Sequence, residues 1–268
     1  MKDLRVRDWI ETLPKTGHNS FAIDEVYSRF PTVSKLNIKS LLHRLSVKNY
    51  ISCIRNGFYA FIPVEYQLKG IIPPIRYIDA LMKYMERKYY VGLLSASAIY
   101  GASHNASQFF TVITELPQIQ NSKKDKSIKF FSRRKVPEKF LRDVKTETGY
   151  VKVSSPELTA SDLFHYSKQI GGLGNASTLL ADLVEVLDFT KLDVNFFKSV
   201  STASIQRMGY VLEEVLQNTF QADMLYQRAN QSNVYFQPII LNPKSSILDK
   251  SANNRWKVVA NIEIEIDE

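Results

Sequence analysis

One stretch of the chain decides the expected fold: residues 34–62, SKLNIKSLLHRLSVKNYISCIRNGFYAFI. Its first half has apolar residues at the i, i+3, i+4, i+7 spacing of an amphipathic helix, with Ser34 as a candidate N-cap. Its second half predicts two strands, Tyr50–Arg55 and Phe58–Ile62, joined by Asn56-Gly57. This dipeptide favours a type I′ turn, because both central positions of that turn need a positive φ. The stretch therefore predicts a helix followed by a β-hairpin.

Two further amphipathic helices are expected before this stretch. Pro14 and Gly17 follow the first apolar stripe, Pro31 follows the second, and Ser20 is a candidate N-cap for the second helix. Three helices and a hairpin, in that order, predict a winged helix-turn-helix over residues 1–72. The three apolar stripes are Val6, Trp9, Ile10 and Leu13; Ile23, Val26, Tyr27 and Phe30; and Ile38, Leu41, Leu42 and Leu45.

The third helix is the candidate DNA reader. A helix in the major groove can offer polar and basic side chains to base edges and phosphates, and Arg55 lies beside the hairpin turn. The alternative is a solvated basic face on a winged helix that makes only protein contacts. Leu36, on the outer face, favours that alternative unless it touches a thymine methyl group. The expected DNA-binding residues are Lys35, Lys39, Ser40, His43, Arg44, Lys48 and Arg55.

Positive charge is concentrated in two parts of the 268-residue chain, whose net charge is +8. Residues 1–90 and residues 121–145 each carry a net +7, whereas residues 146–268 carry −5. A basic excess is typical of proteins that bind a polyanion. Exposed charges interact over only about 8 Å at physiological salt. Whether a basic zone can bind a polyanion therefore depends on how the fold arranges its charges on the surface.

After Pro73-Pro74 the chain predicts a larger α+β domain, residues 73–268, that opens with a bridging helix over 75–88. Thr159 with Asp162 resembles a capping box, and Asn175 is the candidate cap of a leucine-rich helix. The further helices are expected at 91–100, 162–170, from 175 onward, and 203–218. The strands are expected at 109–113, 128–131, 150–153 and in the alternating segment 256–266.

The residues that enzymes use give little support for catalysis. The histidines are scattered and form no zinc-binding pair, so no metal is expected, and Cys53 is expected to be a small core residue. Gly171–Gly174 follows a predicted helix and fits a helix end better than a phosphate loop. Glu86 and Lys88 have a nuclease-like spacing, but on a helix they predict solvated surface. We therefore expect no enzyme activity and no cofactor.

The segment Tyr89–Thr114 has no charged residue and is long enough to span a bilayer. Its polar middle, residues 101–108, argues against a membrane span, because unpaired polar groups in lipid cost several kcal/mol each. We expect a buried helix, a loop and a strand there. With no apolar run after Met1 and a single cysteine, the chain is expected to be cytoplasmic.

The order of several short motifs resembles the AbiEi antitoxins of type IV toxin–antitoxin, or abortive infection, systems. Each motif is weak alone, and the series extends over nearly the whole chain. The motifs are residues 89–96 with Gly101, Ser155–Asp162, Gly171–Asn175, Ile205–Glu213 and Arg255–Asn261.

The resemblance implies two activities. The N-terminal domain would bind inverted repeats in its own promoter and repress it, and the C-terminal domain would counter a cognate AbiEii-type nucleotidyltransferase toxin, without need of a stable complex. The resemblance implies no catalytic residues. A second basic patch could contact phosphates, an acidic toxin surface or the toxin's RNA, or could simply be a solvated loop. It comprises Lys123, Lys124, Lys126, Lys129, Arg133, Arg134 and Lys135.

Overall fold

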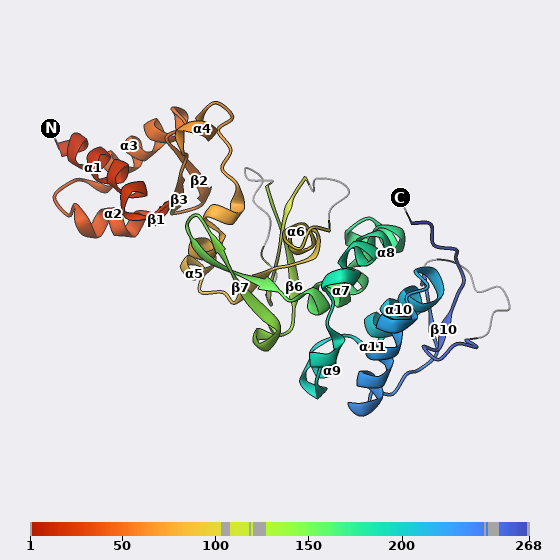
Figure 1. The fold of residues 1–268 in the computed structure, drawn as a ribbon. Coiled ribbons are helices and arrows are strands. Elements are labelled where there is room, and N and C mark those ends of the chain that lie inside the picture. Colours follow the sequence, from red (N-terminus) through yellow and green to blue (C-terminus); the bar gives the residue numbers. More distant parts are fainter. Residues whose placement is uncertain are drawn as a thin grey trace.

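The computed structural model describes residues 2–102, 108–117, 119, 127–243, 245 and 252–266. The fold is mixed α+β. A small helical unit with its own sheet lies at one end, a five-stranded sheet occupies the middle, and a group of helices forms the other end (Figure 1).

The N-terminal unit contains three helices and a three-stranded antiparallel sheet in the order β1-β3-β2. The apolar stripe of the third helix is fully buried against Val6, Ile10 and Leu13 of the first, so the predicted stripes do form one core. The elements are α1 (Lys2–Thr12), the 3-10 turn Pro14–Thr16, β1 (Ser20–Ala22), α2 (Ile23–Arg29), α3 (Lys35–Val47), β2 (Ile51–Arg55) and β3 (Phe58–Phe61).

Local details of this unit confirm one predicted cap and correct another. The Ser34 hydroxyl accepts a hydrogen bond from the Asn37 amide, as expected of an N-cap. The prediction for Ser20 is wrong, because Ser20 opens β1. Instead α2 follows Ala22, whose amide donates to the Glu25 carboxylate at 2.9 Å. That bond satisfies a helix-start donor without any side chain from Ser20.

The hairpin forms where it was predicted, but two of its details differ. Only Gly57 of the turn pair has a positive φ, so the turn is not type I′. A bulge between Cys53 and Arg55 shifts the strand alternation. Cys53, which pairs with Tyr59 before this bulge, is exposed, and the expectation that it is a core residue is wrong. Ile54 and Phe58 are buried on the opposite face of the hairpin.

The expected bridging helix over 75–88 is shorter than predicted. Within that range the chain forms the end of the 3-10 turn Pro74–Arg76 and then α5 (Ile78–Tyr84); a separate short helix, α4 (Val64–Gln67), precedes them. Glu86 adopts a φ of +53°, which a continuing right-handed helix cannot accommodate. Tyr89, just beyond the predicted range, begins a strand. Ile78 and Met82 of α5 are buried, in a cluster that also contains Ile54 and Phe58 of the hairpin.

The five-stranded sheet has the order β6-β5-β4-β8-β7 and mixes parallel with antiparallel pairs. The three expected strands are present, and the uncharged segment contributes β4, α6 and β5. Sequence reasoning missed β7, which pairs antiparallel with β8 from Leu141 opposite Ser154 to Thr146 opposite Gly149. The elements are β4 (Tyr89–Val91), α6 (Leu93–Ile99), β5 (Phe110–Glu115), β6 (Ile128–Arg133), the 3-10 turn Glu138–Phe140, β7 (Leu141–Thr146) and β8 (Gly149–Ser154).

The helices that follow pack into one apolar cluster with the sheet. Two predicted starts are wrong. Ser155, not Thr159, caps the helix that begins at Pro156, and Asn175 lies inside its helix, where its amide donates to the Ile170 carbonyl at 2.6 Å. The elements are α7 (Pro156–His165), α8 (Gly172–Leu183), α9 (Val194–Ser199), α10 (Thr202–Tyr210) with a π-helical continuation (Val211–Val215), α11 (Thr219–Gln231), and 3-10 turns at Ser167–Gln169, Val184–Val186 and Phe189–Lys191.

The predicted strand over 256–266 is limited to β10 (Val258–Val259), which pairs in parallel with β9 (Ile239–Ile240). Trp256, just before it, is fully buried, and its indole donates to the Glu213 carboxylate at 2.6 Å. Gly209 of α10 makes room for the ring, because a Cβ there would lie 2.3 Å from it. The last part of the chain therefore completes the core of this half.

None of the helices in the described ranges has the length and apolar character that a membrane crossing requires. The uncharged segment that raised this question is divided among β4, α6 and β5, with residues 103–107 outside the described part.

Candidate nucleic-acid interface

The outer face of α3 is basic and solvent-exposed. Between Glu25 and Glu65 the chain has six Lys and Arg but no Asp or Glu, so no acidic neighbour in the sequence offsets this charge. Arg55, on the hairpin, is half-buried. The predicted residues of α3 and its C-terminal end are all exposed: Lys35, Lys39, Ser40, His43, Arg44 and Lys48.

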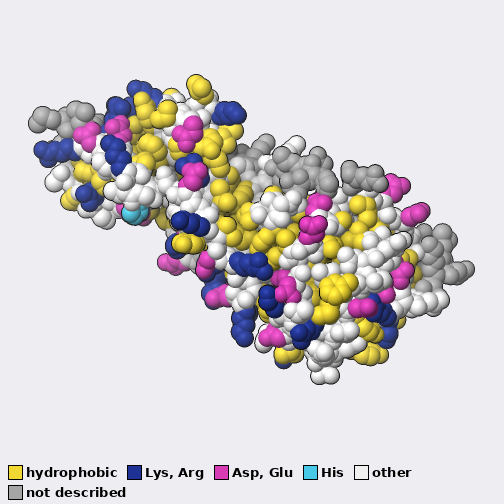
Figure 2. Space-filling view, in the orientation of Figure 1, with side chains coloured by type: hydrophobic (Ala, Val, Ile, Leu, Met, Phe, Trp, Pro, Cys, Tyr) yellow, Lys and Arg dark blue, Asp and Glu magenta, His cyan; other side chains and the backbone are white. Residues whose placement is uncertain are grey.

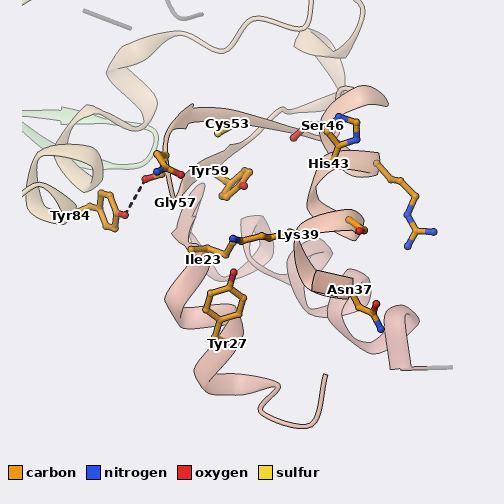
Figure 3. A pocket seen from close by; sticks show the side chains of 13 residues that line it. Ile23, Tyr27, Asn37, Lys39, His43, Ser46, Cys53, Gly57, Tyr59 and Tyr84 are labelled. Atoms are coloured by element: carbon orange, nitrogen blue, oxygen red, sulfur yellow. Dashed lines mark hydrogen bonds between the residues drawn. The ribbon is translucent and has the colours of Figure 1, made fainter. Parts of the chain in front are cut away.

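A groove of about 1210 Å³ lies between α3, α2 and the hairpin (Figure 3). Lys39, Ser40, His43 and Arg44 line it, so the structure brings these four predicted residues together. In Figure 3 the Lys39 side chain extends from α3 across the groove toward α2. The other three predicted residues, Lys35, Lys48 and Arg55, are not among the groove-lining side chains.

Sequence reasoning missed the tyrosines of the groove. Tyr59 of β3 lines it with its ring stacked on Phe21, at 5.6 Å between centroids. Burial, together with the neighbouring Cys53, raises the pKa of Tyr59 to about 12, so its hydroxyl stays protonated and can donate. Tyr27 of α2 holds the Lys35 ammonium 5.1 Å from its ring centroid. The sequence signal for Tyr59 was its place in the predicted strand, where it and the neighbouring Phe58 must point to opposite faces.

The tip of the hairpin is fixed in place. The Gly57 carbonyl accepts from the Ile23 amide at 2.8 Å, and the Tyr84 hydroxyl of α5 donates to the Asn56 carbonyl at 3.2 Å. Gly57 has a φ of +82°, and a Cβ there would lie 2.7 Å from the Tyr84 hydroxyl. Glycine is needed both for the turn and for this close approach. The hairpin is thus held against the second half of the chain.

Two large apolar side chains are exposed on the same helix. Leu36 is 73% exposed and Val47 is 70% exposed. The expected outward position of Leu36 is confirmed. Leu36 and Val47 provide apolar contact area next to the basic residues, which a thymine methyl group or a protein partner can use equally well.

The second basic patch does not form one surface in the described part of the chain. Lys123, Lys124 and Lys126 lie outside the described residues. The Lys129 ammonium donates to the Gln169 carbonyl at 3.0 Å and lies 5.3 Å from the Phe131 ring centroid. Arg134 and Lys135 are exposed at the opposite end of β6. On the face drawn in Figure 2, Lys and Arg side chains lie both over the N-terminal end and along the middle of the molecule.

Arg133 is only partly exposed and its guanidinium is engaged inside the domain, which corrects its place in the patch. Its guanidinium donates to the Tyr90 hydroxyl at 2.5 Å and to the Ser199 carbonyl at 2.6 Å, and it lies 3.4 Å from the Asp162 carboxylate. Tyr90 donates to the other Asp162 oxygen at 2.6 Å. Burial raises the pKa of Asp162 to about 6, although Arg133 and Tyr90 act in the opposite direction. Arg133 therefore serves the interior of the domain.

The residues that were weighed as catalytic or metal-binding candidates do not come together in one site within the described part of the chain. Among the described residues there is no group of three His, Cys, Asp or Glu side chains that could hold a metal ion. His104 lies outside the described residues. Lys88 forms an ion pair with Glu138 at 2.6 Å, beyond the end of α5, and Gly171 and Gly172, both with positive φ, mark the start of α8.

Residues 90–214 match the family model described as the AbiEi antitoxin C-terminal domain. Residues 90–214 are thus an AbiEi antitoxin C-terminal domain. The match includes three of the motif stretches, those at 155–162, 171–175 and 205–213, and most of the stretch at 89–96. It excludes Arg255–Asn261 and the N-terminal unit. An AbiEi antitoxin domain indicates an antitoxin role in a toxin–antitoxin system and implies a toxin as the partner.

The fold of this AbiEi protein is also found in a solved structure. The crystal structure of the RV2827C protein from Mycobacterium tuberculosis matches 93% of this chain and 89% of its own, with a TM-score of 0.64 and 12% identity. At that identity the likeness shows the shared fold alone. The comparison with curated proteins finds no match.

Proposed function

We propose that this AbiEi protein is a DNA-binding autorepressor and an antitoxin, with the two activities in different halves. Residues 1–72 would form a winged helix-turn-helix that binds inverted repeats in its own promoter. Residues 73–268 would neutralise a cognate AbiEii-type nucleotidyltransferase toxin in the cytoplasm, without catalysis and without need of a stable complex. Together these activities make a type IV system for phage defence by abortive infection.

The observation that carries the DNA-binding part is the exposed face of α3. Its polar and basic residues lie together on one side of a helix whose other side is buried, and no acidic residue lies nearby in the sequence. A helix packed in this way can enter the major groove without disturbing its own core. Lys39 and Arg44 then contact phosphates, and Ser40 and His43 reach base edges.

The experiment for DNA binding is a gel shift with the chain's own upstream region. Replacing both Lys39 and Arg44 with Ala is expected to weaken binding by about tenfold or more, because two phosphate contacts and their counterion release are lost. The matched control replaces Lys15 and Lys69, two exposed lysines away from the groove, with Ala. Equal shifts for the two double variants would remove α3 as the reader.

The division of labour has its own test. Cells that express the cognate toxin should be rescued by the wild-type protein and also by the variant that lacks Lys39 and Arg44, when both are produced from a foreign promoter. A promoter–reporter fusion should be repressed only by the wild type. Loss of rescue together with loss of repression, in a variant that folds normally, would show that the two activities are not separate.

A second function is favoured by the exposed Leu36 and Val47. In this alternative the N-terminal unit is a non-catalytic protein-interaction module whose winged helix no longer binds DNA. Apolar side chains of this size on a helix surface are typical anchors of a protein interface. A tight, salt-sensitive complex with one specific duplex would exclude this alternative.

A further inference from the structure

A second cavity, of about 790 Å³, lies where the end of β6, the 3-10 turn Glu138–Phe140, α7 and α9 come together. It is far along the chain from the α3 groove and shares no lining residue with it. Its volume lies within the range of about 300–1,000 Å³ that small-molecule sites usually have. Ligand binding in this cavity is therefore independent of DNA binding by α3.

The cavity is lined by more positive than negative charge. Arg134, Lys135, Lys139 and Lys198 line it, are exposed, and form no ion pair within the described part of the chain. The cavity is also lined by two carboxylates, both of which already have cationic partners. The Glu138 carboxylate is paired with Lys88, and the Asp162 carboxylate with Arg133. Four cations are therefore available to an anionic ligand.

The start of α10 adds to this field. Its N-cap, Ser201, lines the cavity, and the Ser201 side chain makes no capping hydrogen bond. The N-terminus of a helix carries a partial positive charge and amide donors that favour phosphate groups. The helix thus directs its positive end toward the same space as the four cations.

The remaining wall is apolar and partly aromatic, and it is held rigidly. Phe140 packs edge-on against Phe196, at 5.1 Å between ring centroids. The Tyr166 hydroxyl donates to the Ser132 carbonyl at 2.8 Å. Val136, next to them, is buried. A planar, weakly polar group can lie against such a wall without displacing side chains.

We propose that this cavity binds a nucleotide. The phosphates would be held by Arg134, Lys135 and Lys198 near the start of α10, and the base would lie toward Phe140 and Tyr166. Neither the cationic rim nor the apolar wall selects a nucleotide alone, because the rim suits any polyanion and the wall suits any flat ring. The combination, in a cavity of this size, selects a ligand that has both parts. Such a nucleotide can be free or can form the end of an RNA strand.

The first experiment is calorimetric titration of the full-length protein at moderate salt. ATP is expected to bind saturably, at least about tenfold more tightly than either tripolyphosphate, which lacks the nucleoside, or adenosine, which lacks the phosphates. A 5′-phosphorylated RNA pentamer distinguishes the sources: saturable binding of the pentamer alone would assign the site to a strand end. No saturable binding of ATP or pentamer would overturn the proposal, as would equal binding of ATP and tripolyphosphate.

Variants test whether the binding occurs in this cavity. The change of both Lys135 and Lys198 to Ala is expected to weaken ATP binding about tenfold or more, since two charge-assisted hydrogen bonds are lost. The matched control changes Lys145 and Lys168, which are exposed in the same half but do not line the cavity. An equal loss in both double variants would overturn the location.

Photo-crosslinking gives a measurement that does not depend on variants. With 8-azido-ATP, the labelled peptides are expected to come from residues 132–140 and 195–201, and excess ATP should prevent the labelling. Labels confined to residues 35–48, on α3, would show that the nucleotide binds the DNA-reading surface, and would overturn the proposal.

Discussion

The two basic zones of the sequence have the same net charge of +7, but the fold uses them differently. In the first zone, the charges around α3 lie on one exposed helix face with no acidic residue between Glu25 and Glu65. In the second zone, the largely buried Arg133 forms a network with Tyr90 and Asp162, while Arg134 and Lys135, the next two residues, are exposed. Neighbouring positive charges can therefore have opposite roles.

This difference follows from the period of each element. On a helix, residues three and four apart share a face, so a basic face stays together over several turns. At the end of a strand, successive side chains point to opposite sides, so Arg133 points inward and Arg134 points outward. Net charge alone therefore cannot show whether a basic segment is a surface or part of an interior network.

The largest expected effect is the loss of stability when the inward-pointing charge of Arg133 is removed. Arg133→Met is expected to lower the free energy of unfolding by about 3 kcal/mol, because the buried Asp162 carboxylate loses its cationic partner. Urea unfolding followed by circular dichroism measures this change. Arg134→Met, the same substitution one residue later, and Arg44→Met on α3 should leave the unfolding midpoint unchanged. Equal losses at Arg133 and Arg134 would contradict the inward and outward assignment.

A smaller effect is expected in the salt dependence of DNA binding. If Lys39 and Arg44 each contact a phosphate, replacing both with Ala lowers the slope of log affinity against log salt by about 1.8. The advantage of the wild type should then shrink about tenfold between 50 and 200 mM salt. Fluorescence anisotropy with the promoter duplex measures both slopes, and parallel lines would contradict phosphate contact. Arg134→Met provides the control with an unchanged slope.

The smallest effect concerns pH. Burial raises the pKa of Asp162 to about 6 in the folded protein, against about 3.9 for an unfolded Asp, so the folded state binds the proton more tightly. Stability from this group is complete at low pH and is lost as pH rises through 6. Between pH 7 and pH 5 it should add about 1 kcal/mol. Asp162→Asn should lack this increment in urea unfolding, and identical pH profiles for the two proteins would refute it.

The N-terminal elements were predictable because their signals are local. Each apolar stripe lies within one helix, and Asn56-Gly57 specifies its own hairpin. Two predicted boundaries were wrong. The bridging helix ends early, where Glu86 adopts a left-handed φ. The alternating segment 262–266 did not become a strand. Ile262 and Ile264 pack on the C-terminal core instead, without a neighbouring strand among the described residues.

The sites were predictable only where one element carries them. Four of the six α3 residues that line the groove were found from the sequence, because they share a helix face; Asn37 and Ser46 were missed. Tyr59 and Tyr27 were missed because they come from other elements. The second cavity was missed for the same reason, since Lys198 joins Arg134 and Lys135 only through the packing of α9 beside β6. Pairing of Arg133 with Asp162, 29 residues away, leaves no local signature.

The position of Trp256 has a consequence for how the protein is made. The ring fills the space above Gly209 and contacts Tyr226 and Phe236, so the helices of the C-terminal half cannot close their core without it. During translation this residue leaves the ribosome long after α3 and the hairpin. A nascent chain can therefore fold its N-terminal unit before the C-terminal core is complete. We expect antitoxin activity to need this late segment, so that chains that terminate before codon 256 lose it.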